Sequence, residues 1–384
     1  MIYPLIKLIR TGYNGLKSIY KFIMKALVLK SPETLEVMDV PTPILSVGQV
    51  LVKVSKCGLC GSDIRYFHGE NPWAKQTLQI DVPNPPNIIL GHEFVGIVVD
   101  VHDFADRPLI GKWVAVQTWS ACGRCYYCRN GQENFCKQTK HLGHGQGWGE
   151  MDFYPGGMAE YCPVFTNHVH ELPKNITDEQ ATFLDPLTAA LHAVDVAKPE
   201  ILNRVVVLGA GPIGMMIAQL SKVYGASETF ITDIADDNLR IARNLGVDHV
   251  LNVAASGQTI TDLVKTQTGG LGVDRVFNTV GSQDSIVESL ALLKNAGIVV
   301  LLATKNKEIS FPALLLSGER TIKTSTNAMY ADFPRAIGLL ASGLVKVDPM
   351  ITHRFNLRDG VKAFETACNK AQTQAIKIIL NCES

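Results

Sequence analysis

Apolar residues between positions 24 and 184 fall in short runs that glycine, proline and polar residues interrupt. Runs such as Val50–Val54 and Ile88–Val101 are rich in β-branched residues, which is typical of strands. No long stretch in this part has the 3.6-residue period of a helix. The pattern therefore predicts an irregular β domain over residues 24–184.

The pattern changes between residues 185 and 325, where apolar runs alternate with amphipathic stretches of helical period. Such alternation predicts a parallel sheet with helices on both faces, the doubly wound Rossmann arrangement. We expect residues 326–384 to return to the first domain. The fold class is therefore α/β, a doubly wound sheet combined with an irregular β domain. The expected strands of the sheet are Val205–Leu208, Thr229–Thr232, His249–Asn252, Arg275–Asn278, Ile298–Leu302 and Thr321–Thr324.

The composition is that of an ordinary globular protein, with 46% apolar and 19% charged residues. Basic and acidic residues balance to a formal net charge of zero, and no basic stripe indicates a nucleic-acid partner. Nothing after residue 24 is long and apolar enough to cross a membrane. These observations leave a small-molecule enzyme or binding protein as the expected class.

Residues 1–23 differ from the rest because they contain four basic residues and no acid. This pattern is typical of a basic amphipathic helix, which can touch a membrane surface or act as a presequence. The interpretation that we prefer is an unstructured extension, with Met24 as the working start. The basic residues are Lys7, Arg10, Lys17 and Lys21.

A glycine-rich turn follows the first strand of the predicted parallel sheet, with Gly209, Gly211 and Gly214 in Gly-x-Gly-x-x-Gly spacing. The first glycine permits a tight turn, the second lets a pyrophosphate approach the backbone, and the third lets helix and strand pack closely. Pro212 and Ile213 begin the following helix, whose free N–H groups favour phosphate. The segment predicts a dinucleotide site.

Asp233 ends the next predicted strand, 19 residues after Gly214. A carboxylate at this place can hold both ribose hydroxyls and repel a 2′-phosphate. Residues 234–236 contain no arginine that could accept such a phosphate. The sequence therefore favours NAD over NADP.

Four of the nine cysteines lie within one short segment, with two residues between the first three and seven before the fourth. This spacing suits four thiolates around one tetrahedral zinc ion, which leaves no position for substrate and makes the site structural. Two disulfides or free thiols are the alternatives. The clustering favours a reducing compartment, so the expected location is the cytoplasm. The four residues are Cys122, Cys125, Cys128 and Cys136.

A second group of candidate ligands contains Cys60, His92 and Glu93. One thiolate, one imidazole and one carboxylate can hold zinc with an open position, at which a bound alcohol loses its proton more easily. Two other interpretations are open on the residues alone. Cys57 and Cys60 could form a redox pair, and His92 could be a core histidine.

Five motifs occur in order at the expected intervals: GLCGSD (58–63), GHE (91–93), the four cysteines, GGMAEY (156–161) and GAGPIG (209–214). Together they resemble the zinc-containing medium-chain dehydrogenase/reductase family, especially its sorbitol, polyol and threonine dehydrogenase branches. The resemblance covers roughly residues 24–384. It implies a GroES-like catalytic domain over residues 24–184, a Rossmann domain over residues 185–325, and an active site in the cleft between them.

The resemblance also implies roles for individual residues. Cys60 and His92 correspond to ligands of the catalytic zinc, and Ser62 to the hydroxyl that takes the substrate proton. Asp63 is expected to orient His92 through a hydrogen bond. Tyr66 corresponds to a tyrosine that contacts substrate in the polyol branch.

The third protein ligand stays open between Asp185 and Glu93. Asp185 occupies the place of an acidic residue in the family, although an aspartate before a proline is also an ordinary helix N-cap. Glu93 follows the ligand histidine and could approach the metal. We expect one of them to bind directly while the other acts through water or exchanges during turnover.

Three positions depart from the family pattern. Arg65 stands where many members have the histidine that ends the proton relay, and arginine is a poor base. Ala328 and Met329 stand where polyol enzymes have an arginine and a tyrosine, which weakens the case for sorbitol itself. The loop His141–Trp148, rich in glycine and histidine, is either part of the substrate pocket or a plain surface loop.

The sequence thus predicts a zinc-dependent enzyme that moves a hydride between NAD and a secondary alcohol, here a polyol, cyclitol or sugar derivative. The nearest rival is an amino-alcohol enzyme of the threonine 3-dehydrogenase kind, which the context of Asp185 favours. A zinc- and nucleotide-binding scaffold without catalysis is the rival from another class. By analogy we expect a homo-oligomer, with a tetramer preferred.

Overall fold

The structure is a computed structural model that describes residues 23–303 and 308–383. The prediction for the basic segment 1–23 lies outside the described residues, except for Ile23. Within the described part, no helix combines the length and apolar character that a membrane crossing needs. All nine cysteines are free of disulfides.

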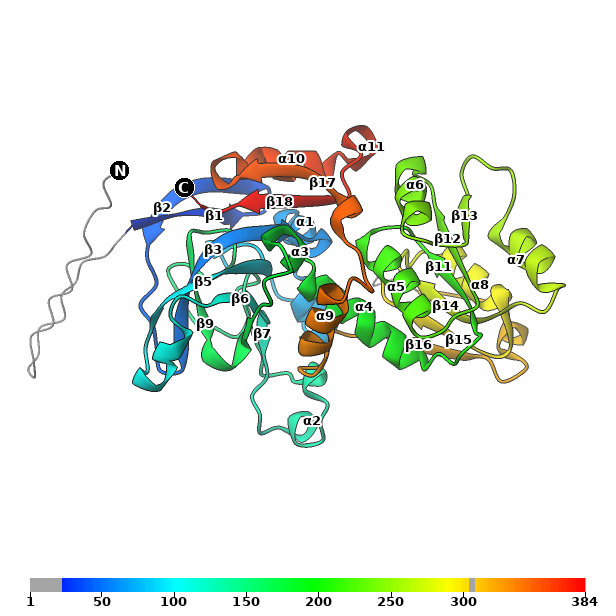
Figure 1. Cartoon of the computed structure of the whole chain (residues 1–384), viewed down its shortest axis with the longest axis horizontal. Helices are drawn as coiled ribbons and strands as arrows, with labels where there is room; N and C mark the ends of the chain where they lie inside the picture. Colours follow the sequence, from blue (N-terminus) through cyan, green and yellow to red (C-terminus); the bar gives the residue numbers. More distant parts are fainter. Residues whose placement is uncertain (1–22, 304–307, 384) are drawn as a thin grey trace, which may run out of the picture.

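The first part of the chain forms an irregular antiparallel β structure (Figure 1, left). A seven-stranded sheet has the order β10-β6-β5-β3-β18-β17, and β9 pairs with β3. A three-stranded sheet, β2-β1-β4, and the short pair β7-β8 complete it. The strands are β1 (Ile23–Ser31), β2 (Thr34–Pro41), β3 (Gln49–Leu59), β4 (Ile88–Ile89), β5 (Glu93–Val101), β6 (Trp113–Val116), β7 (Trp119–Ser120), β8 (Lys140–His141), β9 (Tyr161–Phe165) and β10 (Val169–Glu171). The short helices α1 (Gly61–Phe67) and α2 (Tyr126–Arg129) lie between these strands, and α3 (Asp178–Ala181) follows β10.

The single strand expected over Ile88–Val101 is wrong, because the segment contains two strands that belong to different sheets. β4 ends at Ile89 and β5 begins at Glu93. Between them Gly91 has φ +94°, a left-handed conformation in which a Cβ atom would meet the Cys57 sulfur at 2.6 Å. This turn directs His92 away from the ladder and toward α1.

The second part is a six-stranded sheet in which every neighbouring pair is parallel. Its order, β13-β12-β11-β14-β15-β16, is that of a doubly wound dinucleotide-binding sheet, so the predicted fold class is confirmed. The strands are β11 (Arg204–Leu208), β12 (Glu228–Asp233), β13 (His249–Asn252), β14 (Val273–Asn278), β15 (Leu293–Leu301) and β16 (Thr321–Thr324). The helices are α4 (Leu184–Ala197), α5 (Pro212–Val223), α6 (Asp236–Asn244), α7 (Ile260–Thr268) and α8 (Gln283–Leu292).

The last segment returns to the antiparallel sheet. It contains α9 (Asp332–Ala341), β17 (Ile351–Asn356), α10 (Gly360–Cys368), α11 (Lys370–Thr373) and β18 (Lys377–Asn381). β18 runs antiparallel to β3 and pairs Ile378 with Leu59. The beginning of β18 therefore lies beside the loop that carries Cys60.

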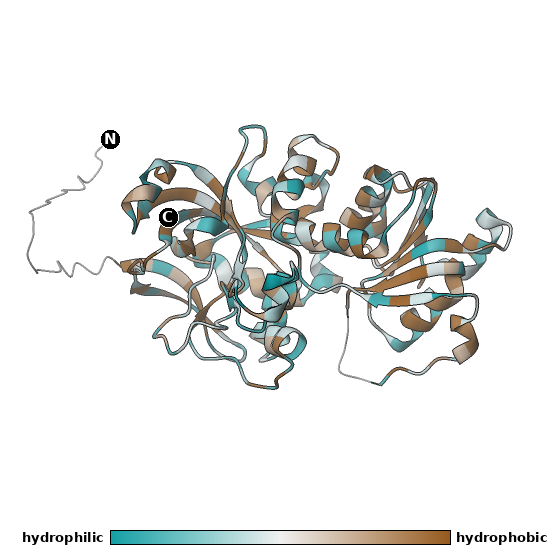
Figure 2. Cartoon of the chain, turned by 90° about the horizontal axis from the view of Figure 1, so that it is seen from below, coloured by the Kyte–Doolittle hydropathy of each residue, from teal (hydrophilic) through white to brown (hydrophobic). Residues whose placement is uncertain are grey.

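One apolar core joins the two sheets. Val95 and Ala115 of the antiparallel sheet belong to the same buried cluster as Leu187 of α4 and Val205 of the parallel sheet. In Figure 2 the hydrophobic colour concentrates on strands and helices rather than on the connecting loops. Burial of this shared core fixes the relative position of the two sheets, and with it the shape of the cleft between them.

Asp332, at the start of α9, makes polar contacts that hold this part of the returning segment in place. Asp332 accepts the Met329 N–H at 2.8 Å and faces the Arg335 guanidinium at 3.0 Å. Burial raises the pKa of Asp332, but hydrogen bonds from the His192 ring and the Met329 N–H lower it by more, so that its pKa lies below the usual value.

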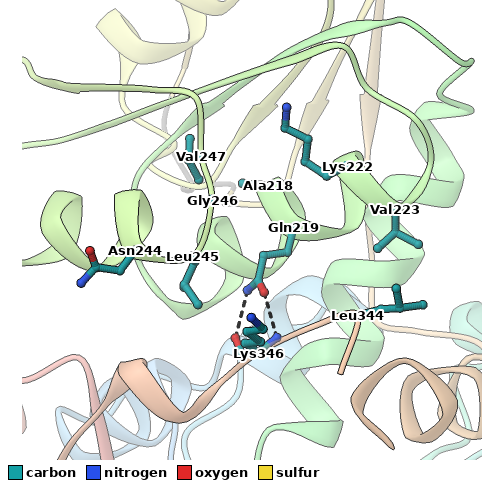
Figure 3. A pocket seen from close by; sticks show the side chains of 10 residues that line it. All are labelled: Ala218, Gln219, Lys222, Val223, Asn244, Leu245, Gly246, Val247, Leu344 and Lys346. Carbon is teal, nitrogen blue, oxygen red and sulfur yellow. Dashed lines mark hydrogen bonds between the residues drawn. The ribbon is translucent and has the colours of Figure 1, made fainter. Parts of the chain in front are cut away.

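A hollow of about 430 Å³ lies at the C-terminal end of α5, the end opposite the glycine turn (Figure 3). Beside it the Gln219 side chain donates to the Lys346 carbonyl at 3.0 Å and accepts the Lys346 N–H at 2.8 Å. These two bonds tie α5 to the segment that follows α9.

Candidate functional site

The glycine turn between β11 and α5 has the geometry of a phosphate-binding loop. Gly209 has φ +99°, which favours glycine. A Cβ on Gly214 would lie 1.9 Å from the Gly209 carbonyl oxygen, whereas one on Gly211 would meet no atom within 4 Å. The third glycine thus permits close packing, and the second leaves open space where a pyrophosphate can approach. Pro212 occupies the first turn of α5.

Asp233 lies at the end of β12 beside this turn. Its Oδ2 accepts the Ala210 N–H at 2.7 Å, and its Oδ1 accepts the N–H groups of Ile234 and Ala235 at 2.8 and 3.0 Å. The carboxylate is therefore fixed next to the place where the ribose of a dinucleotide lies in this fold.

The four clustered cysteines converge in the lobe around α2, which extends from the antiparallel part (Figure 1). Their sulfur atoms all lie within 4.8 Å of one another. The sulfur of Cys128 is 3.5 Å from that of Cys125 and 4.0 Å from that of Cys122. These distances are far too long for disulfides, and they fit the separation of about 3.8 Å between thiolates 2.3 Å from one tetrahedral zinc ion. The donor set suits structural zinc.

Within the lobe, the surroundings of Cys122 favour its thiolate over its thiol. Hydrogen bonding by the Arg124 N–H lowers the pKa of Cys122 to about 6. Burial acts in the opposite direction on Cys128 and raises its pKa to about 12. A cation is needed to hold all four groups as thiolates together.

The second cluster is built by two neighbouring antiparallel strands. β3 and β5 pair Gly58 with Glu93, so the end of one strand lies beside the beginning of the other. Cys60 follows β3 and begins α1, and His92 precedes β5. One ligand atom from each of Cys60, His92 and Glu93 lies within 4.8 Å of the other two. These three groups form a donor set that fits zinc.

Asp185 is not part of this group of three. It lies in the first turn of α4, where its Oδ1 accepts the Thr118 hydroxyl at 3.3 Å. Burial raises the pKa of Asp185 to about 6, and the charge of Glu93 adds to this effect. The carboxylate is therefore close enough to sense the cluster although it does not converge with it.

The Glu93 carboxylate forms an ion pair with Lys377 of β18. The side chains are 1% and 3% exposed, so the pair is buried. Burial lowers the pKa of Lys377, but the Glu93 charge raises it by more, so that its pKa lies above the usual value. Sequence reasoning missed Lys377, since a lysine at the start of a strand is usually solvated.

Ser62 and Asp63 meet His92 from the two sides of its ring. The Ser62 hydroxyl lies 3.3 Å from His92 Nε2, and Asp63 Oδ1 lies 3.5 Å from His92 Nδ1. Asp63 Oδ2 also accepts the Cys60 N–H at 2.8 Å. Burial lowers the pKa of His92, but Asp63 and Cys60 raise it by more, which leaves it well above the usual value.

Tyr66 and Arg65 face different surroundings. Tyr66 is buried, and its hydroxyl donates to Asn71 at 3.4 Å rather than toward the ligand cluster. Its ring stacks on His144 with centroids 4.5 Å apart. The Arg65 guanidinium forms an exposed ion pair with Glu70 at 2.8 Å. It is therefore engaged outside the place where a proton relay is expected.

Two histidines of the loop His141–Trp148 lie against the ligand cluster. His141 and His144 are buried and stacked, with ring centroids 3.8 Å apart. The His144 centroid is 4.6 Å from that of His92. Burial lowers the pKa of His141 to about 3 and that of His144 well below its usual value, and the neighbouring imidazoles add to the effect. Of the two possibilities that the sequence left open for this loop, the structure excludes a plain surface loop.

A cavity of about 320 Å³ connects the ligand cluster with the glycine turn. Its lining includes Cys60, Glu93 and Lys377 together with Gly211 and Ile213. A dinucleotide bound at the glycine turn can thus extend its reactive end toward the metal ligands. The fold and the site together define a class of protein that binds a nicotinamide cofactor and a metal ion in one cleft.

Comparisons with known proteins agree with this class. Residues 46–174 match the family described as the alcohol dehydrogenase GroES-like domain, and residues 212–342 match the zinc-binding dehydrogenase family. The chain belongs to the zinc-containing medium-chain dehydrogenase/reductase family, and it is a zinc-dependent alcohol oxidoreductase.

Two curated relatives cover almost the whole chain. Sorbitol dehydrogenase of Bombyx mori is 30% identical over 94% of this chain and 99% of its own length. L-Threonine 3-dehydrogenase of Legionella pneumophila (strain Corby) is 32% identical over 93% of this chain and 100% of its own length. The two branches suggested by the sequence motifs are therefore both represented among its relatives.

Solved structures show the same fold with two different cofactors. The RspB alcohol dehydrogenase of Escherichia coli CFT073, in complex with NADH, is 26% identical and superposes with a TM-score of 0.81, over 94% of this chain and 99% of that one. A zinc-binding dehydrogenase of Sinorhizobium meliloti 1021, bound to NADP, is 28% identical with a TM-score of 0.80, over 94% and 99% of the two chains. A nicotinamide cofactor is thus supported, in either form.

Proposed function

We propose that this protein is an NAD-dependent dehydrogenase that oxidises a secondary hydroxyl of a polyol, cyclitol or sugar derivative, or reduces the corresponding ketone. The observation that carries the proposal is the cavity that joins Cys60 and Glu93 to the glycine turn at Gly211. Hydride transfer needs the alcohol carbon and the nicotinamide side by side, and this cavity offers a place for both.

Cys60 and His92 hold the catalytic zinc in this proposal, with Glu93 as the direct third ligand. Glu93 is preferred over Asp185 because its carboxylate converges with the other two ligand atoms. When bound, zinc polarises the substrate hydroxyl and lowers its pKa. Asp185 then acts from the side, through water or by exchange with Glu93.

Ser62 accepts the substrate proton, since its hydroxyl lies at the edge of the His92 ring. Asp63 keeps the ring oriented through its contact with Nδ1. Arg65 is committed to Glu70, so the proton leaves Ser62 toward the cofactor ribose or water. These residues bind, orient and move one proton, while the cofactor takes the hydride.

NAD is the proposed form of the cofactor because Asp233 is held beside the glycine turn. A fixed carboxylate there hydrogen-bonds ribose hydroxyls and repels a 2′-phosphate. Gly209 and Gly214 shape the turn, and Gly211, with Pro212 and Ile213 in the first turn of α5, faces the pyrophosphate.

A threonine 3-dehydrogenase activity is the second candidate. It is favoured by Asp185 in its Leu-Asp-Pro context and by the similarity to threonine dehydrogenases. Oxidation of L-threonine without oxidation of any polyol would replace the first proposal with this one. A panel of sugar alcohols, cyclitols and L-threonine, followed by NADH absorbance, separates the two.

The decisive variant is Cys60→Ser in the zinc-loaded protein. It should abolish turnover while NADH still binds, because the glycine turn is untouched. Cys162→Ser is a matched control, since this buried thiol lies in β9 outside the ligand cluster. Full activity of Cys60→Ser, or no metal bound near Cys60 and His92, would refute the proposal.

The domain boundaries, the cellular location and the oligomeric state are also proposals. We infer an extension at residues 1–23, a catalytic domain at 24–184 with its structural zinc lobe, a cofactor domain at 185–325 and a return segment at 326–384. The unpaired, clustered thiols are consistent with a cytoplasmic location, and family analogy supports a homotetramer. Fluorescence microscopy of the tagged full chain and light scattering test these two points.

A further inference from the structure

The segment between β16 and α9, residues 325–331, carries the chain from the parallel sheet back to the antiparallel part. The lobe of the four clustered cysteines holds this segment near both of its ends. The Asn134 side chain donates to the Thr326 carbonyl at 3.1 Å, and the Glu133 carboxylate accepts the Tyr330 N–H at 2.9 Å. The lobe is therefore bonded to the return segment as well as to the sheet from which it extends.

The side chain of Tyr330 adds further attachments. Its hydroxyl oxygen accepts the N–H of Ala121, the residue that precedes the first cysteine of the lobe. Its ring stacks on Trp119 with centroids 4.8 Å apart, and the His168 ring meets it edge-on at 5.3 Å. Trp119 is buried, so the stack lies inside the protein. One side chain of the return segment thus fixes both the first residue of the lobe and the strand that leads into it.

The strand that this ring contacts is β7, and β7 is connected to the ligand cluster in two ways. Thr118, the residue before β7, donates its hydroxyl to Asp185 at 3.3 Å. β7 also pairs with β8, which places Trp119 opposite His141, and the His141 ring centroid lies 5.7 Å from that of His92. A displacement of β7 would therefore move Asp185 and His141 relative to the metal ligands.

We infer that Tyr330 is a positioning residue for the alcohol site: it fastens β7 between the lobe and the return segment, and so keeps Asp185 and His141 in place beside the metal ligands. The inference rests on the proposed dehydrogenase function and adds a residue outside the ligand set and the glycine turn. The three metal ligands lie at the ends of β3 and β5, and the glycine turn follows β11. Loosening β7 should therefore weaken alcohol binding more than the chemical step or cofactor binding.

Tyr330→Phe keeps the ring that stacks on Trp119 but removes the oxygen that accepts the Ala121 N–H. One such hydrogen bond is worth about fivefold in an equilibrium constant. In the zinc-loaded enzyme the KM for the alcohol should therefore rise about fivefold, while kcat stays within about twofold and the Kd for NADH does not change. The probes are D-sorbitol, xylitol, myo-inositol and L-threonine, and the KM is followed on the best substrate of these four.

Two further variants distinguish the anchor from a general loss of packing. Glu133→Ala removes the acceptor of the Tyr330 N–H from the lobe side and should raise the KM in the same way. Tyr224→Phe is the matched control, because its hydroxyl donates to Asp195 at 2.6 Å and accepts from Arg335 at 2.7 Å, on helices rather than on β7. It should leave the KM within about twofold of wild type. An equal rise in Tyr224→Phe would overturn the inference.

Hydrogen–deuterium exchange, followed by mass spectrometry of the zinc-loaded full chain, measures the same anchor without turnover. The Leu142 N–H, beside the β7–β8 pair, donates to the Thr118 carbonyl at 2.8 Å. In Tyr330→Phe, peptides that contain this N–H should exchange about fivefold faster than in wild type, because β7 opens more often. Peptides from the glycine turn, residues 209–214, should keep the wild-type rate, whereas a global loss of stability would speed both.

The two measurements separate failure of this inference from failure of the proposed function. If a probe is oxidised, a KM of Tyr330→Phe within about twofold of wild type, or exchange that is unchanged or uniformly faster, overturns the inference alone. If the wild type oxidises none of the four probes, the proposed function fails and the exchange pattern decides. Faster exchange confined to β7 and β8 then supports the anchor, and any other pattern overturns it.

Discussion

Lys377→Met should show how much the buried ion pair between Lys377 and Glu93 contributes to stability. The substitution keeps most of the length and the apolar stem of the side chain but removes the charge that faces Glu93. Both partners are nearly inaccessible to water, so the remaining carboxylate cannot be solvated without rearrangement. Breaking a buried pair in this way typically costs about 3–5 kcal/mol of unfolding free energy.

The assay is urea unfolding at pH 7.5, once with a chelator and once with excess zinc. At an m-value of about 3 kcal/mol/M, the chelated Lys377→Met protein should lose roughly 1–1.7 M in midpoint relative to the chelated wild type. Zinc held by Glu93, as proposed, would replace the missing positive charge. The loss should therefore shrink by more than half in the zinc-loaded proteins.

Two further variants make the reasoning refutable. Lys56→Met removes a partly exposed lysine that bonds Asn381 at 3.1 Å on the same sheet, and it should cost less than about 1 kcal/mol. Adding Glu93→Gln to Lys377→Met removes the orphaned charge and should restore much of the stability. A Lys377→Met loss no larger than that of Lys56→Met, or no recovery in the double variant, contradicts a buried pair.

Three other predictions concern the remaining parts of the fold. Cys122→Ser should lose one zinc ion per chain by mass spectrometry and make the lobe sensitive to protease, with NADH affinity unchanged because the glycine turn is remote. Gly214→Ala forces a Cβ onto the Gly209 carbonyl and should weaken NADH binding about 10–100-fold by fluorescence titration, whereas Gly338→Ala, which has open space, should not. Hydrogen bonds hold the pKa of Asp332 below its usual value despite burial. The ionised side chain should therefore contribute its full stabilisation of the folded protein above the pKa of the unfolded chain, about 3.9. This contribution should disappear as the pH falls through the lower pKa of the folded protein. The stability difference between wild type and Asp332→Asn, measured from pH 7 to pH 2, should vanish at the acid end, and a constant difference contradicts this account.

The features that sequence predicted well are those whose residues lie close together in the chain. The four cysteines fall within residues 122–136, and their convergence follows from the turns between them. The glycine turn follows directly from a strand that precedes a helix. The parallel sheet itself is confirmed, because its alternating pattern admits few topologies.

Features that depend on long-range pairing were predicted only through family resemblance or were missed. Cys60 and His92 are brought together by the register of β3 against β5, which no local pattern specifies. Lys377 meets Glu93 across 284 positions only because β18 joins the far side of β3. The break between β4 and β5 was missed because apolar residues stand on both sides of the short segment from Gly91 to Glu93. His144 was visible as part of a histidine-containing loop, but its burial was not.

The charges around the cleft give a physical reason for a divalent cation at this place. Cys60, His92 and Glu93 converge, Asp63 and Asp185 act on them from nearby, and Lys377 and the His92 imidazole are the bases that face these acids. Buried charges are tolerated only when they are paired. Lys377 faces Glu93 and His92 faces Asp63, so Cys60 and Asp185 have no basic partner among the described residues, and a divalent cation held by Cys60, His92 and Glu93 would supply one. The positive ring of oxidised nicotinamide would add to this effect in the same cavity, so that metal and cofactor would each improve the site for the other. The acids are Cys60, Asp63, Glu93 and Asp185.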